Sequence, residues 1–383
     1  MKPRIALMTY AIDGRPAKGS ALYARKVVEG LLKHTEYDFF LVHYEPSNDP
    51  LYRMGAREIL MPIIPRLPVG TRFIRQMLFF WKYRKEPFDI IHWFQPRLYP
   101  FFWLAPAGRI VVTMHGAGDI TAPAPFNIPK SVFIWVLKHF NTHIDAVIAA
   151  SHEASREIAK HYGILVEKIY VTYNGVDEDF KPVLKAEAFE RVSKKYGIRK
   201  SYVLDVSRLQ AHKNIGTLIK AYEIARSGDS RMQEQLVIVG SPAGDHRKIY
   251  AAARNSACKD DIHFISYVDQ CDLNDMYAAA SLFVFPSLDE GFGLPIIEAF
   301  ASGTPVIASN IPALSEIAAG AALLVNPRSP DDIAEAMTRA LHDDDLRNSL
   351  VQKGTPRARL FNWSNTVQET LAIYSHIGGI KTS

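Results

Sequence analysis

A chain of 383 residues is long for one hydrophobic core, so two domains are expected. Its composition, 48% hydrophobic and 22% charged, excludes a disordered chain. Two cysteines, Cys258 and Cys271, are too few for a disulfide framework or a zinc site, which favours a reducing compartment. No apolar run approaches the roughly 20 residues that span a bilayer, and the start, MKPRIALMTYAIDG, lacks a signal peptide's apolar core. The expected location is the cytoplasm.

The net charge of +5 belongs to the first half of the chain. Residues 1–180 hold 22 Lys and Arg against 17 Asp and Glu, which accounts for the whole excess. Such an imbalance favours association with anionic surfaces and carries no information about the fold.

Short apolar runs alternate with helical patterns along the whole chain. Strands are expected, in chain order, at residues 4–10, 38–44, 90–94, 109–115, 146–151, 169–174, 201–207, 236–240, 262–266, 282–287, 305–309 and 321–325. Runs that are apolar on both faces and separated by helices indicate parallel sheets covered on both sides. The predicted fold class is α/β, with two facing doubly wound, Rossmann-like domains and a cleft between them.

A break between the two series lies in NGVDEDFKPV, residues 174–183, where Asn-Gly, acidic residues and Pro182 interrupt the periodicity. The predicted domains are therefore 1–178 and 179–360. Residues 361–383 carry apolar residues at helical spacing, and this C-terminal helix is expected to cross back to the first domain.

The stretch SLDEGFGLPIIEAF combines a buried strand's end, a glycine-rich turn and a helix that should begin near Pro295. Gly291 and Gly293 allow backbone close to a ligand, and the amides at the helix start suit an anion. Glu298, one turn into the helix, suits a ribose diol, and Glu290 suits sugar hydroxyls. The alternative is that Glu298 only favours the helix dipole and that Glu290 is only solvated.

Two further stretches end predicted strands. In VSRLQAHKN, Arg208 and Lys213 flank a loop, and together they suit a diphosphate leaving group; two solvated side chains are the alternative. In VVTMHGAGD, His115 is placed to contact a donor sugar, against a histidine that merely caps a strand. Near the N-terminus, Gly19 and Ser20 open an amphipathic helix, where they either approach a phosphate or form a simple cap.

Taken together, EGFGLPIIE followed by AFASGTPVIAS, with SRLQAHKN, YNGVD and a late FNWSN…Y helix, resembles the retaining nucleotide-sugar-dependent glycosyltransferases of the GT-B fold. The resemblance covers nearly the whole chain. Within that class it extends to bacterial mannosyl-, glucosyl- and rhamnosyltransferases of polysaccharide assembly, including lipopolysaccharide.

This resemblance implies roles for the residues named above. Glu298 would bind the ribose, Glu290 the sugar hydroxyls, and Arg208 with Lys213 the leaving diphosphate, while His115 would lie beside the reacting sugar. The backbone amides that would hold the sugar or the diphosphate are those of Gly291, Phe292, Gly293 and Leu294. Transfer would retain the anomeric configuration without a protein nucleophile, the departing phosphate helping to deprotonate the acceptor. The donor would be GDP-mannose or, next, a UDP-hexose, and the acceptor a glycan or a lipid-linked glycan.

Some positions depart from the family's pattern. Many relatives have Gly-Gly where this chain has Gly19-Ser20, and Ala211 stands where Glu is common. No cofactor and no metal are expected, because the Asp-x-Asp pattern at Asp177–Asp179 lies in the linker and is interpreted as a solvated acidic turn.

Residues 66–85, RLPVGTRFIRQMLFFWKYRK, hold six basic side chains and no acid. On a helix, Phe73, Ile74, Met77, Leu78, Phe80 and Trp81 would share a stripe, with Arg72, Arg75 and Lys82 elsewhere. This pattern favours a peripheral helix on anionic lipid at the inner membrane face, while core packing with a solvated basic face is the alternative. Nucleic-acid binding is not expected, since no reader motif accompanies the basic residues.

Two other functions fit parts of the pattern. A sugar-nucleotide epimerase also uses two facing α/β domains, but it needs acid–base carboxylates in the cleft. A non-catalytic sugar-binding protein needs neither a diphosphate clamp nor cytoplasmic location.

Overall fold

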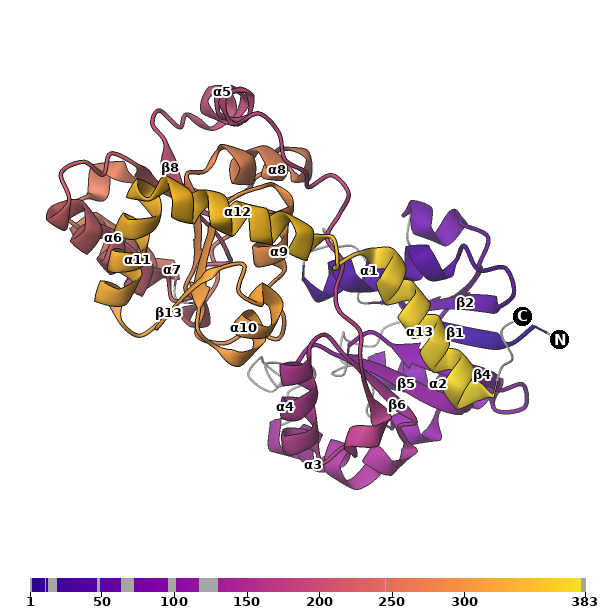
Figure 1. Ribbon diagram of the computed structural model, residues 1–383. Helices are drawn as coiled ribbons and strands as arrows, with labels where there is room; N and C mark the ends of the chain where they lie inside the picture. Colours follow the sequence, from indigo (N-terminus) through magenta and orange to yellow (C-terminus); the bar gives the residue numbers. More distant parts are fainter. Residues whose placement is uncertain are drawn as a thin grey trace. The chain divides into compact units, whose positions relative to one another are not determined.

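The computed structural model describes residues 2–10, 12, 19–46, 49–62, 72–95, 101–116, 130–244 and 246–379, with backbone alone at 72–73 and 130–133. The chain forms two compact units (Figure 1). The first unit comprises Met1–Gly175 and Trp363–Ser383, and the second comprises Val176–Asn362. The division after Gly175 lies close to the boundary expected at residue 178.

The first unit is built on a parallel sheet of seven strands in the order β3-β2-β1-β4-β5-β6-β7. Its strands are β1 (Arg4–Met8), β2 (Asp38–His43), β3 (Arg57–Leu60), β4 (Phe88–Trp93), β5 (Ala107–Met114), β6 (Ala146–Ala149) and β7 (Ile169–Val171). Strand β3 was not predicted from the sequence. This strand is short and largely exposed at the sheet's edge, so it carries no apolar run.

Helices cover both faces of this sheet. Its helices are α1 (Ser20–Leu31), α2 (Arg72–Tyr83), α3 (Lys130–Phe140), α4 (His152–Tyr162) and α13 (Trp363–Gly378). Alternate strand residues form two cores: Leu7 and Leu41 face α1 and α13, while Met8 and Val42 belong to the core that α2, α3 and α4 share. Figure 1 shows α13 lying beside α1.

Helix α13 is joined to the first unit by specific bonds as well as by apolar contacts. Thr366 donates a hydrogen bond to the carbonyl of Tyr173 at 2.6 Å. The Tyr374 hydroxyl lies 2.6 Å from Nδ1 of buried His92, whose Nε2 is 2.9 Å from Thr113 Oγ1. Burial lowers the pKa of His92 to about 3, so the ring is neutral at physiological pH.

Helix α2 lies over its core differently from the predicted stripe. Phe80 faces the core, whereas Ile74, Leu78 and Trp81, which were predicted to share its stripe, face outward. Arg75, predicted on a basic face, is buried: it donates hydrogen bonds to the carbonyls of Pro62 (2.9 Å), Met61 (3.1 Å) and Tyr44, and to Glu45 Oε1. Carbonyls left over at the ends of strands supply what a buried guanidinium needs. Residues 66–71 of the basic segment lie outside the described residues.

The second unit repeats the doubly wound arrangement with six parallel strands in the order β10-β9-β8-β11-β12-β13. The strands are β8 (Tyr202–Val206), β9 (Gln235–Val239), β10 (Ile262–Ile265), β11 (Leu282–Phe285), β12 (Val306–Ser309) and β13 (Leu323–Val325). The helices are α5 (Lys185–Tyr196), α6 (Ile215–Gly228), α7 (His246–Asn255), α8 (Gln270–Ala279), α9 (Leu294–Ala301), α10 (Pro312–Ala318), α11 (Pro330–His342) and α12 (Asp344–Ala358). The predicted two-domain, Rossmann-like α/β class is confirmed.

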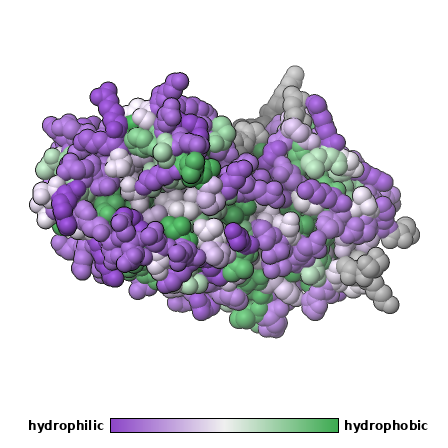
Figure 2. All heavy atoms as spheres, turned by 45° about the horizontal axis from the view of Figure 1, so that its top comes forward, coloured by the Kyte–Doolittle hydropathy of each residue, from purple (hydrophilic) through white to green (hydrophobic). Residues whose placement is uncertain are grey.

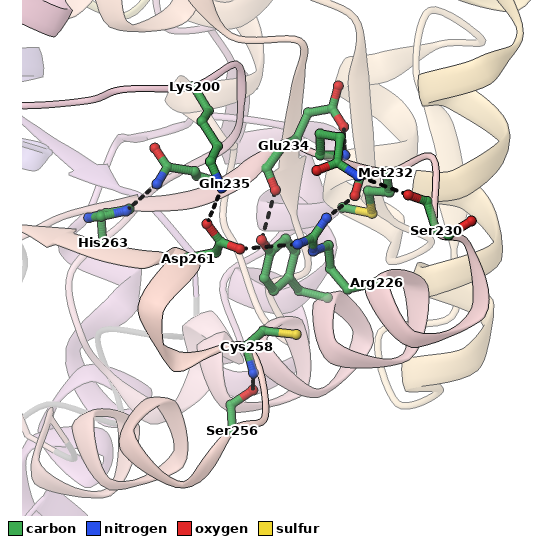
Figure 3. Close-up of polar contacts among 12 residues, drawn as sticks. Lys200, Arg226, Ser230, Met232, Glu234, Gln235, Ser256, Cys258, Asp261 and His263 are labelled. Carbon is green, nitrogen blue, oxygen red and sulfur yellow. Dashed lines mark hydrogen bonds and ion pairs between the residues drawn. The ribbon is translucent and has the colours of Figure 1, made fainter.

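Polar contacts close the amino-terminal edge of the second sheet (Figure 3). Asp261, just before β10, accepts from Lys200 at 2.9 Å and from Arg226 at 3.1 Å. Gln235, at the start of β9, bonds His263 of β10 at 2.7 Å. Open α/β sheets bind ligands at the opposite, carboxyl-terminal edge.

On the face of the molecule shown in Figure 2, hydrophilic residues predominate and hydrophobic residues form separate patches. Among the described residues, none of the helices has the length and apolar character needed to cross a bilayer.

Candidate active site

The candidate site of the second unit is built from two loops at the carboxyl ends of neighbouring strands. Strand β8 leads into residues 207–214, and β11 leads into residues 286–293. The two strands pair in parallel, with Val203 opposite Leu282. Their ends therefore meet at one sheet edge, although the loops are almost 80 residues apart in sequence.

Hydrogen bonds tie these loops together. The amide of Leu288 donates to the carbonyl of His212 at 2.7 Å, and the Ser287 hydroxyl donates to the same carbonyl at 3.0 Å. Asn214 adopts φ 59° and donates from Nδ2 to the carbonyl of Pro286 at 3.0 Å. Asparagine is among the few residues that adopt this conformation readily. The loop of the basic residues is thus held against the loop of the glutamate turn.

Lys213 and Glu290, predicted for separate roles, form an ion pair. Their side chains are only 15% and 13% exposed, and the Lys213 ammonium lies 5.0 Å from the centroid of the Phe285 ring. A pair this sheltered keeps more of its attraction than a surface pair, and its components are costly to separate without replacement partners. The site therefore holds one cation and one carboxylate in fixed positions.

His212, which the sequence analysis did not single out, lies among the charges of both loops. Its pKa is lowered, first by burial and then by the positive charge of Lys213, with a smaller contribution from Arg208. Glu290 and Asp289 oppose the shift. Arg208 is exposed, and so is Ala211, the position where relatives often have Glu. Two cations and two carboxylates thus lie close to a single imidazole.

Asp205 is a buried acid that sequence reasoning missed. It lies in β8 with no exposed surface, where Ser207 Oγ donates to its Oδ1 at 2.6 Å and its Oδ2 has no partner among the described residues. Burial raises its pKa to about 7, against smaller opposing effects of Ser207 and Lys213. A charge inside an otherwise apolar run was the available signal, because such residues are rarely buried unpaired.

The turn before α9 requires a glycine at position 293. This residue caps the N-terminus of α9 with φ 103°, and a Cβ there would lie 2.6 Å from the Leu314 side chain. Neither the conformation nor the space accepts a larger residue. Helix α9 starts at Leu294, with Pro295 in its first turn as predicted. Phe292 is buried, with its ring 5.7 Å from that of Phe361, so this side chain anchors the turn while its amide remains a candidate ligand.

Glu298 lies on α9 and is partly buried. It accepts a hydrogen bond from the Tyr277 hydroxyl at 2.8 Å. Burial raises its pKa to about 7; the Tyr277 bond opposes this shift, and the negative charge of Asp177 adds to it. The interpretation of Asp177–Asp179 as solvated holds for Glu178 and Asp179, which are exposed, but Asp177 is partly buried and acts on Glu298.

The remaining predicted residues belong to the first unit. His115 follows β5, with its ring 4.9 Å from that of Tyr23 in an edge-to-face arrangement, and Nε2 has no partner among the described residues. Burial lowers its pKa to about 4, so the imidazole is neutral. Gly19 caps α1 with φ 58°, and Ser20 Oγ accepts from Gln95 Nε2 at 3.0 Å.

A resident metal ion would need a cluster of carboxylate, imidazole or thiolate ligands. Within the described ranges, no group of three or more His, Cys, Asp and Glu side chains is placed to hold one.

Comparisons with known proteins match both halves of the chain. Residues 17–180 match the family described as Glycosyltransferase Family 4, and residues 188–357 match the family described as Glycosyl transferases group 1. With the two parallel sheets, these matches identify the chain as a glycosyltransferase of the GT-B fold.

Among curated proteins, O-antigen chain mannosyltransferase B of Escherichia coli is 29% identical over 70% of this chain and 70% of its own length. O-antigen chain mannosyltransferase RfbU of Salmonella typhimurium is 32% identical over 56% of each chain. The serotype-specific mannosyltransferase WbdA of E. coli is 29% identical over 58% of this chain, which spans only 28% of that longer protein.

Solved structures share the whole fold at low identity. Sucrose-phosphate synthase from Thermosynechococcus elongatus has a TM-score of 0.76 at 22% identity, with 99% of this chain and all of that chain covered. Anabaena Alr3699/HepE, solved with UDP and glucose, has a TM-score of 0.76 at 17% identity over 98% of this chain and 100% of its own. WaaG, a glycosyltransferase of lipopolysaccharide biosynthesis, has a TM-score of 0.72 at 16% identity over 97% of this chain and 98% of its own.

Proposed function

We propose that this glycosyltransferase moves a hexose from a nucleoside diphosphate sugar to a glycan or lipid-linked acceptor during cell-surface polysaccharide assembly. GDP-mannose is the favoured donor, because two relatives are named as O-antigen chain mannosyltransferases. A UDP-hexose is next, supported by the likeness to HepE solved with UDP-glucose. The proposed location is the cytoplasm, at the inner face of the membrane.

The sheltered pair of Lys213 and Glu290 is the observation that carries this proposal. A diphosphate offers Lys213 a stronger anionic partner than one carboxylate, and exposed Arg208 adds a second cation from the same loop. Glu290, released from the lysine, is then available to accept hydrogen bonds from sugar hydroxyls. The pair holds both groups in place until the donor replaces it.

The proposed reaction retains the configuration at the sugar's anomeric carbon. The bond from that carbon to the diphosphate oxygen breaks, and the acceptor oxygen bonds to the same face of the sugar. The acceptor's proton passes to the departing phosphate, so no protein nucleophile takes part. Lys213 and Arg208 stabilise the charge that develops on the leaving group, an effect worth on the order of 3 kcal/mol for one well-placed group. In this proposal these side chains perform the charge neutralisation without a metal ion.

The other residues are assigned to binding the donor. Ionised Glu298 accepts hydrogen bonds from the ribose hydroxyls, and the amides of the 291–294 turn, at the start of α9, hold the phosphate or the sugar. In the first unit, the proposal assigns His115 to the reacting sugar and the backbone of Gly19 and Ser20 to the phosphate.

The test is incubation with GDP-, UDP- and dTDP-sugars, followed by measurement of the released nucleoside diphosphate. A thermal-shift screen with the same compounds ranks the donors, since a ligand of the folded state raises the midpoint. Separate Lys213→Ala and Glu298→Ala variants should lose most activity. Lys220→Ala is the matched control, because Lys220 belongs to an exposed Lys–Glu pair on α6 of the same unit. Wild-type rates in both site variants would refute the site assignment.

Product analysis of the same incubation separates the alternatives. An epimerase releases a changed sugar nucleotide and needs no acceptor. The observation that favours an epimerase is that the pKa values of Asp205 and Glu298 lie at about 7, as suits acid–base catalysis. A binding protein leaves the donor intact. A new glycosidic bond with stoichiometric nucleoside diphosphate supports transfer.

A further inference from the structure

Tyr277 of α8 is the hydrogen-bond partner that the second unit itself supplies to Glu298 of α9. The Tyr277 side chain has no exposed surface, and its hydroxyl donates to Glu298 Oε2 at 2.8 Å. Burial, followed by the negative charge of Glu298, raises the pKa of this phenol well above its usual range. The hydroxyl therefore keeps its proton at physiological pH and stays a donor to the ionised carboxylate.

The Tyr277 side chain is fixed by its own surroundings. Its ring lies 5.2 Å from that of Phe283 in β11 and 6.0 Å from that of Phe180, both in edge-to-face arrangements. The carbonyl of Tyr277 accepts a hydrogen bond from the buried Thr304 hydroxyl at 2.8 Å. These contacts do not involve Glu298, so the phenol keeps its place whatever the carboxylate does.

The backbone at Glu298 is fixed to the same helix α8. The Glu298 carbonyl accepts from the amide of Ser302, at the end of α9, at 3.0 Å. The Ser302 hydroxyl lies 2.8 Å from the Glu298 carbonyl and 2.9 Å from Oδ1 of Asn274, which is one turn before Tyr277 on α8. Helices α8 and α9 are thus joined at a second point, which holds the phenol and the carboxyl at a constant separation.

The bond from Tyr277 leaves most of the Glu298 carboxylate available. The side chain is only partly buried, and within the described ranges no protein group donates to its Oε1. An ionised carboxylate has about four acceptor sites, so two hydroxyls of a diol can still be bound. Burial and the charge of Asp177, in the segment before α5, disfavour the ionised form, whereas the Tyr277 hydrogen bond favours it.

We propose that Tyr277 is a positioning residue for the donor nucleotide, whose hydroxyl orients the Glu298 carboxylate and holds it ionised for the two ribose hydroxyls. This inference rests on the proposed function, which assigns the ribose to Glu298. Tyr277 acts through Glu298 and does not itself contact the donor. Its contribution therefore belongs to recognition of the ribose diol and not to recognition of the base or the phosphates.

The experiment is isothermal titration of the full chain with GDP and with UDP, each compared with its dideoxyribose analogue, over a range of pH. The variants are Tyr277→Phe and Glu298→Gln. Tyr222→Phe is the matched control, because Tyr222 is another fully buried tyrosine of the second unit. Its hydroxyl donates to the carbonyl of Glu234, just before β9, at 2.7 Å. Circular dichroism and thermal melting show that each variant is folded.

We expect Tyr277→Phe to lower the affinity for the tighter-binding nucleotide about tenfold at pH 7, the loss typical of a hydrogen bond to a charged group. Because the ionised carboxylate loses a donor, the midpoint of the pH profile should move upward by about one pH unit. Affinity for the dideoxyribose analogue should be unchanged. Tyr222→Phe should match the wild type in all these measurements.

Equal losses for the ribose and dideoxyribose forms, with an unmoved midpoint, would mean that Tyr277 only supports the fold, and they overturn the inference. A preference for ribose that Tyr277→Phe keeps and Glu298→Gln loses also overturns it, but leaves the ribose with Glu298. If Glu298→Gln keeps the preference, or neither nucleotide binds the wild type, the ribose assignment fails and this inference fails with it. Release of nucleoside diphosphate from nucleotide sugars still tests the transfer reaction separately.

A second variant serves if Tyr277→Phe does not fold. Tyr277→3-fluorotyrosine keeps the hydroxyl, and its more acidic phenol is a stronger donor. The midpoint of the pH profile should then move to lower pH, with a higher affinity for the ribose form at pH 7. An unchanged profile in this variant overturns the inference.

Discussion

The first six strands of the two sheets follow the same order, but the large pKa shifts of imidazoles and carboxyls differ between the units. In the first unit, the pKa values of the His92 and His115 imidazoles fall to about 3 and about 4. In the second, the pKa values of the Asp205 and Glu298 carboxyls rise to about 7. Burial is the largest cause in all four cases.

The same physical effect therefore gives the two units different behaviour near neutral pH. Desolvation favours the neutral form of any acid or base. An imidazole with a pKa of 3 to 4 stays neutral throughout the physiological range, whereas a carboxyl with a pKa near 7 changes charge within it. Among these four groups, only the two carboxyls of the second unit change charge near neutrality.

The largest expected effect tests the charged pair of the second unit. Lys213→Ala and Glu290→Ala should each lower kcat/KM about 100-fold or more, because each removes a group that the proposed function places on the reacting donor. The double variant should be little worse than the poorer single one, since the two groups act together. Steady-state kinetics with the preferred donor measures this.

The exposed pair of Lys220 and Glu223 supplies the control cycle. Its single and double alanine variants should keep activity within about twofold, as expected for a surface pair. Fully additive losses at Lys213 and Glu290 would contradict the idea that they form one functional unit.

Much of this site was predictable from residue order, and the exceptions have physical causes. Strand ends and glycine turns are local signals, so the positions of Lys213, Glu290 and Glu298 followed from the sequence. The contact of Lys213 with Glu290 did not, because it depends on β8 lying next to β11. Asp205 was missed since one acid inside an apolar run reads as part of the strand.

Prediction of the fold from the sequence was limited in the same way. Every predicted strand corresponds to a strand of the structure, and β3 was missed because its residues are polar and exposed at an edge. Helix α2 was recognised, yet Arg75 was assigned to the solvent side. Both sides of this helix carry apolar residues, so periodicity alone could not tell which side packs inward.

Asp205 should make the free energy of unfolding depend on pH. Its pKa is raised from an ordinary 3.8 to about 7, so the unfolded chain loses this proton before the folded chain does. Asp205 consequently costs stability as pH rises from about 4 to about 7, and the cost is constant above that. Asp205→Asn removes the charge and should increase the free energy of unfolding relative to wild type.

This gain should grow by about 2 to 3 kcal/mol between pH 5 and pH 8, the equivalent of two pKa units. Urea unfolding at both pH values measures it, with exposed Asp260→Asn as the control. A gain that stays constant with pH, or a loss that grows with pH, would contradict the assigned titration.

A smaller effect is expected on nucleotide binding through Glu298. The carboxyl is protonated below its pKa of about 7 and ionised above it, and only the ionised form accepts paired hydrogen bonds from a ribose diol. Wild-type affinity for the preferred nucleoside diphosphate should fall up to about tenfold from pH 8 to pH 6. Glu298→Gln should bind weakly with a flatter profile.

Isothermal titration of both proteins with the same nucleotide isolates the protein's contribution, because the phosphate's own protonation affects both equally. Parallel pH profiles for the wild type and Glu298→Gln would remove the ribose role from this carboxyl.

The smallest expected effect is that His92 and His115 of the first unit do not titrate near neutral pH. With pKa values of about 3 and about 4, His92 and His115 should show no change in imidazole NMR shifts between pH 5.5 and 8 in the folded protein. In urea, the same rings should titrate near the ordinary value of about 6.5. A folded-state midpoint near 6.5 for His115 would mean that the ring is hydrated, and the contrast between the units would then rest on His92 alone. A silent His115 would contact the sugar that the proposed function assigns to it as a neutral imidazole, able to donate or accept a hydrogen bond but not to neutralise a phosphate. The proposal gives that task to Lys213 and Arg208.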